Sequence, residues 1–109
     1  MNNITEVLTE ARELISDPKR WTQGLYARDV RGNYTKWNSP EAACWCSAGA
    51  IAKVVGASTD SDIEYDPIAK RAIKKLMYGI NSSIYKFNDS HTHAEVLTAF
   101  DKVIRKGQA

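Results

Sequence analysis

The sequence lacks the features that would place it in a membrane or a secretory pathway. No apolar run approaches the ~18 to 20 residues that a helix needs to span a bilayer. Residues 1–15 have neither the basic start nor the unbroken apolar stretch of a signal peptide. We therefore expect a soluble protein that stays in the cytoplasm and makes no contact with a membrane.

An excess of charge of either sign is also missing. The chain has 15 Lys and Arg against 13 Asp and Glu, a net charge of +2 that is too small to predict an anionic partner. Its length of 109 residues is enough to bury a core without metal or disulfide support, and we find no repeat, low-complexity tract or linker. The composition predicts one compact domain over residues 1–109.

Cysteine is scarce, since only Cys44 and Cys46 are present. A disulfide between them would close a strained small ring, because side chains two positions apart on a helix diverge. We expect two reduced thiols.

The most informative stretch is S-P-E-A-A-C-W-C-S-A-G-A-I-A-K-V-V-G, residues 39–56. Ser39 suits an N-cap, Pro40 the first helical position and Gly56 a left-handed closing residue. Between these ends Glu41 and Lys53 are the only charged residues, and a helix that is apolar on nearly all sides belongs in an interior. The pattern predicts a buried central helix over residues 39–56.

Three further helices are indicated by apolar residues at helical spacing. The first covers residues 4–15, the second begins at Asp66-Pro67 and closes at Gly79, and the last begins at residue 92 and ends just before Gly107. Thr92 and Glu95 have the spacing of a capping box at the start of the last helix. Residues 80–88 are interpreted as a linking segment that is compatible with an extended conformation.

Residues 24–37 have a different pattern. Two β-compatible runs, 25–28 and 34–37, flank a turn-rich interval, which predicts either a small β-hairpin or an aromatic loop. The expected fold is therefore mainly α (α+β), with about four helices packed round the buried central helix. Four aromatic residues of this part of the chain can cover the helices or be presented to a protein partner: Trp21, Tyr26, Tyr34 and Trp37.

A cysteine nucleophile is one candidate for chemistry, because a thiolate needs a nearby base and a third group that orients the base. The candidates are Cys46 or Cys44 as nucleophile, His93 or His91 as base, and Asp89 or Asn88 as orienting group. Reactive thiols are usually found at a helix N-terminus, whereas both cysteines fall inside the predicted central helix. Packing is the simpler role for Cys44, and Cys46 is expected to be the more accessible of the two.

A metal site is disfavoured. The C-x-C and H-x-H pairs have ligand types that suit zinc, but residues i and i+2 of a helix diverge by about 200°. The acidic run in residues 60–66 has Tyr65 where a calcium loop needs glycine and Arg71 where it needs glutamate. We predict no metal and no cofactor.

Polar residues are densest over residues 88–95, where turn formation and helix capping explain most of them. The remaining hypothesis is a site for a small anion at a helix N-terminus, formed by Asn88, Asp89, Thr92 and His93. A basic helix face is formed by Lys70, Arg71, Lys74 and Lys75, while Arg105 and Lys106 add charge elsewhere. Such a face is usually the solvated side of a helix, so nucleic acid is not expected as the partner.

Three sequence blocks resemble an uncharacterised family of small bacterial and phage proteins, known only as a domain of unknown function. They are W-T-Q-G-L-Y-A-R-D at residues 21–29, W-C-x-x-G-A at 45–50, and F-N-D followed by T-H-A-E-V at 87–96. The resemblance implies a single small domain, a cytoplasmic setting and a link to mobile elements. It brings no established activity and no catalytic residue.

Three functions are therefore ranked. The leading hypothesis is a small cytoplasmic accessory protein, a non-enzymatic binding module for a protein partner or a small anionic ligand. The alternative is a thiol-dependent hydrolase or transferase that uses the Cys and His candidates. The third is weak nucleic-acid binding through the basic helix face.

Overall fold

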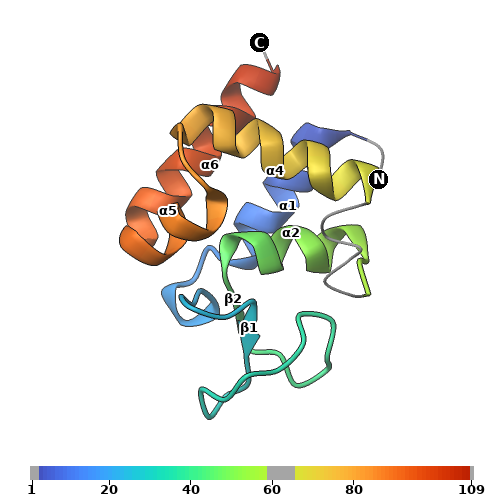
Figure 1. The fold of residues 1–109 in the computed structure, drawn as a ribbon, viewed down its shortest axis with the longest axis vertical. Helices are drawn as coiled ribbons and strands as arrows, with labels where there is room; N and C mark the ends of the chain where they lie inside the picture. The colour runs from blue at the N-terminus through green and yellow to red at the C-terminus, as the bar shows by residue number, and fades with distance from the viewer. Residues whose placement is uncertain (1–2, 59–65, 109) are drawn as a thin grey trace.

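The computed structural model describes residues 3–58 and 66–108, which are mainly helical (Figure 1). Within them lie five α-helices: α1 (Ile4–Leu14), α2 (Ser47–Val55), α4 (Pro67–Ile80), α5 (Ile84–Ser90) and α6 (His93–Gln108). A short 3-10 helix, η1 (Pro18–Arg20), precedes a two-stranded antiparallel sheet of β1 (Ala27–Arg28) and β2 (Cys44–Trp45). The predicted class, mainly α with a small β element, is confirmed. None of the helices in these two ranges is both long and apolar enough to cross a membrane.

The helices at the two ends of the chain and α4 begin at capping side chains. The carboxylate of Asp66 accepts hydrogen bonds from the N–H groups of Ile68 and Ala69, both at 2.9 Å. Thr92 and Glu95 form the predicted capping box, with N···O distances of 2.8 and 3.2 Å. The hydrogen bonds from Thr92 also hold the pKa of the Glu95 carboxyl below its ordinary value. The capping residues and the N–H groups that they bind lie within three positions of each other, which is why these helix N-termini could be predicted from the sequence.

The predicted start of the central helix at Ser39 is wrong. Residues 39–42 form a turn, in which the N–H of Ala42 donates to the carbonyl of Ser39 at 3.1 Å. The chain then enters β2, and α2 begins only at Ser47 with Cys46 as its N-cap. The cause is pairing with a distant segment, since β2 is hydrogen-bonded to β1. The predicted end is correct, because Gly56 closes α2 with a φ of 80°.

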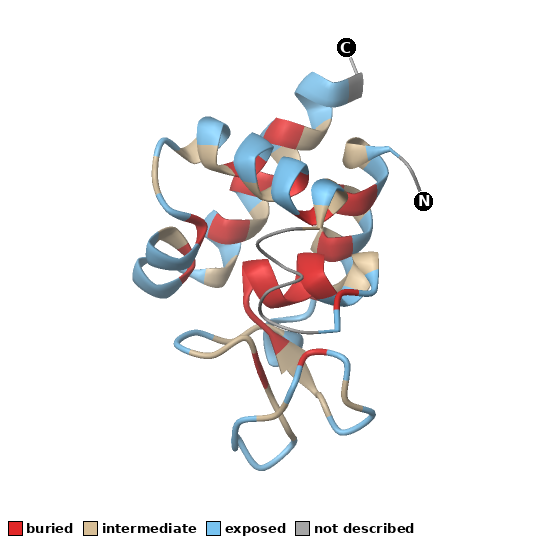
Figure 2. Cartoon of the chain, turned by 45° about the vertical axis from the view of Figure 1, so that its right-hand side comes forward, coloured by how far each residue is buried: buried red, intermediate tan, exposed pale blue. Residues whose placement is uncertain are grey.

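Helix α2 lies in the interior, in contact with α1, α4 and α5. All residues from Ser47 to Ala52 are buried, as the red segment of Figure 2 shows. Gly49 allows this helix to approach the loop beneath it, because a Cβ at this position would overlap the carbonyl group of Tyr26.

Residues 21–46, here called the loop region, lie below α2 in the view of Figure 1. Ala27 pairs with Trp45 and Arg28 with Cys44, so the partner of β1 is not the run 34–37 that a hairpin would require. Only a single bridge joins Arg28 to Tyr34 in the described loop. Two backbone hydrogen bonds accompany this antiparallel bridge, from the N–H of Asp29 to the carbonyl of Asn33 and from the N–H of Thr35 to the carbonyl of Ala27. The hairpin alternative therefore holds only in this minimal form, and the paired strands of the sheet are β1 and β2.

The segment interpreted as an extended link contains α5. Ser83 precedes the helix, and the two buried side chains, Ile84 and Asn88, are one turn apart on the same face. A helix of 7 residues shows too few turns for a periodic pattern to stand out from a linker.

Candidate functional site

Cys46 is a buried thiol at the N-terminus of α2. Its Sγ accepts a hydrogen bond from the N–H of Gly49 at 3.3 Å, and the residue is 6% exposed. Burial raises the pKa of Cys46 to about 11, with a smaller rise from the negative charge of Asp89. The thiol is therefore neutral at pH 7. The accessibility prediction is wrong, because Cys44 is half-buried and Cys46 is buried.

Both histidines contact backbone carbonyl groups. The Nε2 atom of His93 lies 2.6 Å from the carbonyl oxygen of Ile15, and the Nδ1 atom of His91 lies 2.9 Å from that of Phe87. Within residues 3–58 and 66–108, neither imidazole is hydrogen-bonded to a thiol. The structure therefore does not assemble the Cys, His and Asp candidates into a hydrogen-bonded triad.

Asn88 is the centre of a buried hydrogen-bond network. Its Oδ1 accepts from Trp21 Nε1 at 2.8 Å, from Ser47 N at 3.0 Å and from Ser47 Oγ at 2.8 Å. Its Nδ2 donates to the carbonyl of Thr22 at 3.0 Å and to Asp89 Oδ1 at 3.1 Å. The amide is fully satisfied by the protein, so its observed role is to hold α5 against α2 and the loop region.

The other residues of the predicted anion site are also engaged within the fold. Asp89 accepts from the N–H of Gly24 at 3.0 Å, Thr92 caps α6, and His93 contacts the carbonyl of Ile15, the residue that follows α1. A ligand at this place would have to displace these contacts. The anion site remains a prediction, and each of these four residues already makes at least one hydrogen bond within the fold.

The predicted partner-binding aromatic residues differ in exposure. Trp37 is 1% exposed, and its Nε1 donates to the carbonyl of Ala57, which makes it part of the core. Trp21 and Tyr26 are half-buried, whereas Tyr34 is 56% exposed. Of the four, only Tyr34 presents most of its surface to solvent.

No group of three or more His, Cys, Asp or Glu residues that could hold a metal ion occurs in the part of the chain that the structure describes. The acidic run of residues 60–66, which lacks the glycine and glutamate of a calcium loop, lies outside that part, apart from Asp66, which caps α4.

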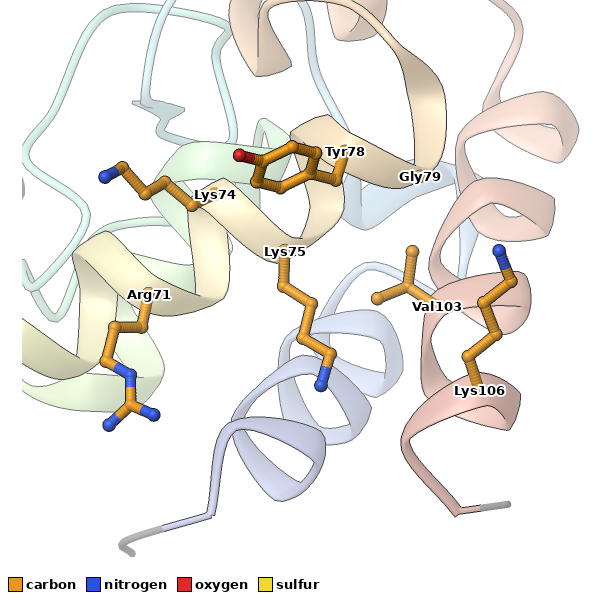
Figure 3. A pocket seen from close by; sticks show the side chains of 7 residues that line it. All are labelled: Arg71, Lys74, Lys75, Tyr78, Gly79, Val103 and Lys106. Atoms are coloured by element: carbon orange, nitrogen blue, oxygen red, sulfur yellow. The ribbon is translucent and has the colours of Figure 1, made fainter.

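A groove lies between α4 and α6, and it has a volume of about 480 Å³ (Figure 3). Four of its seven lining residues are cationic, while most of the lining surface is apolar: Arg71, Lys74, Lys75, Tyr78, Gly79, Val103 and Lys106. Gly79 has no side chain at the point where Val103 of α6 approaches α4, so the two helices come close along this line. We call this feature the α4–α6 groove.

The groove concentrates positive charge that the low net charge of the chain conceals. Residues 67–87 contain five Lys and Arg and no Asp or Glu, whereas the whole chain has a net charge of +2. Among the described residues the only ion pair is between Arg12 and Asp101, outside the groove lining. The sequence analysis placed Lys106 away from the basic face. That placement is wrong, because the packing of α6 on α4 brings Lys106 into the same groove.

Tyr78 is the residue that the sequence analysis missed. It is 87% exposed, and it lines both the α4–α6 groove and a second hollow of about 430 Å³. The members of the second hollow are Lys74, Met77, Tyr78, Asn81 and Ser82. Helical spacing was a usable signal, since position 78 follows positions 71, 74 and 75 on one face of α4.

A family model matches residues 1–106 of the chain, and its description is a family of unknown function. The predicted resemblance to such a family is thereby confirmed at that level. No curated protein and no solved structure matches the chain.

Proposed function

Since the chain belongs to a family of unknown function (DUF6197), we propose a function from its own geometry: it is a non-enzymatic binding module that holds an anionic ligand in the α4–α6 groove. In the same proposal it is a cytoplasmic accessory protein of bacterial or phage origin, linked to mobile elements. These three attributes rest on the sequence analysis alone.

One observation carries the proposal: four cationic side chains line a single groove without an acidic partner. They are Arg71, Lys74, Lys75 and Lys106, and all four are exposed. Like charges three or four positions apart on a helix destabilise it by about 0.2–0.5 kcal/mol per pair. An anion between them reverses the sign of this interaction, so the groove gains more from an anionic occupant than from water alone.

A binding role also agrees with the state of the nucleophile candidates. Cys46 is protonated at neutral pH, and both histidines contact backbone carbonyl groups. A thiol-dependent hydrolase or transferase needs a thiolate and a free base. Binding of an anion in the α4–α6 groove requires neither a thiolate nor a free base.

The test is a binding titration with a general polyanion, a fluorescein-labelled heparin oligosaccharide, followed by fluorescence anisotropy. The double variant Lys74→Glu, Lys75→Glu is compared with Lys19→Glu, Lys53→Glu, which has the same net charge but changes exposed lysines outside the groove. We expect the groove variant to bind at least about tenfold more weakly, equivalent to about 1.4 kcal/mol, and the control to lose less than about twofold. Equal losses in both variants would contradict the proposed site, as would wild-type protein that does not bind.

A further inference from the structure

We propose that the anionic ligand of the α4–α6 groove is single-stranded nucleic acid, with the Tyr78 ring as the surface on which a base stacks. This inference rests on the proposed function, because it names the ligand class of the same groove.

The exposure of Tyr78 is the first argument. At 87% exposed, the ring contributes little to the packing of the fold, and Tyr34 and Tyr85 are less exposed at 56% and 44%. The ring contacts in the described chain involve other aromatic residues, and the 87% exposure of Tyr78 leaves most of its side chain open to a ligand. Stacking of a base on an exposed aromatic side chain, beside a cationic track, is the general way in which proteins bind single strands.

The position of Tyr78 between two hollows is the second argument. On one side lie the cations Arg71, Lys75 and Lys106, which suit phosphate groups. On the other side the lining includes Asn81 and Ser82, uncharged side chains that can both donate and accept hydrogen bonds. Lys74 lines both hollows, as Tyr78 does. The charged backbone of a single strand can thus contact the first hollow, and its neutral base edges can contact Asn81 and Ser82 of the second, with Tyr78 common to both.

The length of α4 along the two hollows indicates a binding site for only a few nucleotides. From Arg71 to Ile80, the last residue of α4, the helix rises by about 14 Å. Single-strand sites on small domains begin at about four nucleotides. The four cations of the groove therefore match three or four phosphate groups.

Two other occupants use less of this surface. A duplex keeps its base faces stacked inside the helix, so Tyr78 would have no base to contact. An acidic peptide would engage the cations but would leave the exposed ring and the uncharged side chains of Asn81 and Ser82 without a role. Single-stranded nucleic acid uses all three features.

The experiment measures anisotropy of three labelled probes at matched ionic strength: the oligonucleotide dT10, a ten-base-pair DNA duplex and a decaglutamate peptide. We expect dT10 to bind tightest. Tyr78→Ala should weaken dT10 binding about five- to a hundredfold, the range for loss of one stacked base. The control Tyr78→Phe keeps the ring and should change binding less than about twofold. Because Tyr78 is exposed, both variants should retain the circular dichroism of the wild type.

Salt dependence gives a second readout. With three or four phosphate contacts, the slope of log K against log salt should be about −2 to −3 for the wild type. Lys74→Gln should reduce its magnitude by about 0.7, while Tyr78→Ala should leave it nearly unchanged. This pattern would separate the charge contacts from the stacking contact.

The outcomes distinguish the two proposals. If decaglutamate binds as tightly as dT10, or if Tyr78→Ala binds dT10 like the wild type, the nucleic-acid inference is overturned while the anion groove stands. Tighter binding of the duplex than of dT10 also overturns it. If none of the three probes binds, the nucleic-acid inference is overturned, and the heparin titration alone decides the anion groove.

Discussion

At the scale of single residues, Cys46 combines two opposing effects on a thiol. The N–H groups at the start of α2 favour the thiolate, and a residue in this position is often reactive. Burial favours the neutral thiol, and it dominates, raising the pKa to about 11. The position that activates a cysteine in other folds here holds an N-cap whose sulfur accepts the N–H of Gly49.

This raised pKa predicts that Cys46 makes the protein less stable at high pH. Below pH 9.0, the ordinary pKa of the thiol, both the folded and the unfolded chain hold the proton. Between pH 9.0 and about 11 only the unfolded chain releases it, so the free energy of unfolding should fall by up to about 1.4 kcal/mol per pH unit. Urea unfolding of the wild type and of Cys46→Ser at pH 8, 9 and 10 measures this contribution, with Cys44→Ser as control. Parallel pH profiles for the wild type and Cys46→Ser would contradict it.

At the scale of the elements, α2 is positioned by a close backbone contact as well as by side-chain packing. The carbonyl of Tyr26 accepts a hydrogen bond from the N–H of Cys46 at 3.1 Å, immediately before α2 begins. Gly49 lies one turn further along the helix, against the same carbonyl group. The contact joins the central helix to the segment that leads into β1.

Gly49→Ala should therefore destabilise the protein, although alanine is the better helix former by about 1 kcal/mol. The added Cβ would meet backbone atoms, which cannot rotate away as a side chain can. We expect a loss of at least about 2 kcal/mol in urea unfolding. Gly79→Ala is the comparison, because its Cβ would meet a methyl group of Val103 that can reorient, and its loss should be smaller. A Gly49→Ala protein that is more stable than the wild type would show that the contact between α2 and the carbonyl group of Tyr26 leaves room for a methyl group.

The elements that could be predicted are those whose signals lie within one segment of the chain, and those that could not depend on a distant partner. Helices α1, α4 and α6 have a long apolar stripe and a local cap, such as Asp66 or Thr92, and both signals lie within one segment. The start of α2 depends instead on the pairing of Cys44 with Arg28, a partner 16 residues away. For the same reason, only part of the α4–α6 groove could be predicted from the sequence. Arg71, Lys74 and Lys75 share a helix, whereas Lys106 joins them only through packing of α6.

At the scale of the whole molecule, the side chain of Asn88 joins three parts that are far apart in the chain. It links α5 to Ser47 at the start of α2 and to Trp21 and Thr22 of the loop region. The residue is 1% exposed, so these hydrogen bonds are made without competition from water.

Asn88→Ala should lower the free energy of unfolding by about 3 kcal/mol or more. It would leave three donors without their acceptor: the buried N–H and hydroxyl of Ser47, and the half-buried Trp21 Nε1–H. The exposed Asn38 offers a matched control, and Asn38→Ala should change stability by less than about 0.5 kcal/mol. Urea unfolding measures both variants. Equal stability of the two would mean that water replaces the Asn88 amide at little cost.

The placement of the tryptophans makes the two halves of the molecule spectroscopically distinct. All 3 tryptophans of the chain, Trp21, Trp37 and Trp45, belong to the loop region, and each donates its indole N–H to a protein acceptor. Their emission therefore reports the environment of the loop region, while the far-ultraviolet circular dichroism arises chiefly from the helices. The wild-type chain thus contains an intrinsic reporter on the side of α2 away from the α4–α6 groove, and the contacts of Trp21 with Asn88 and His93 make it sensitive also to the junction with α5 and α6.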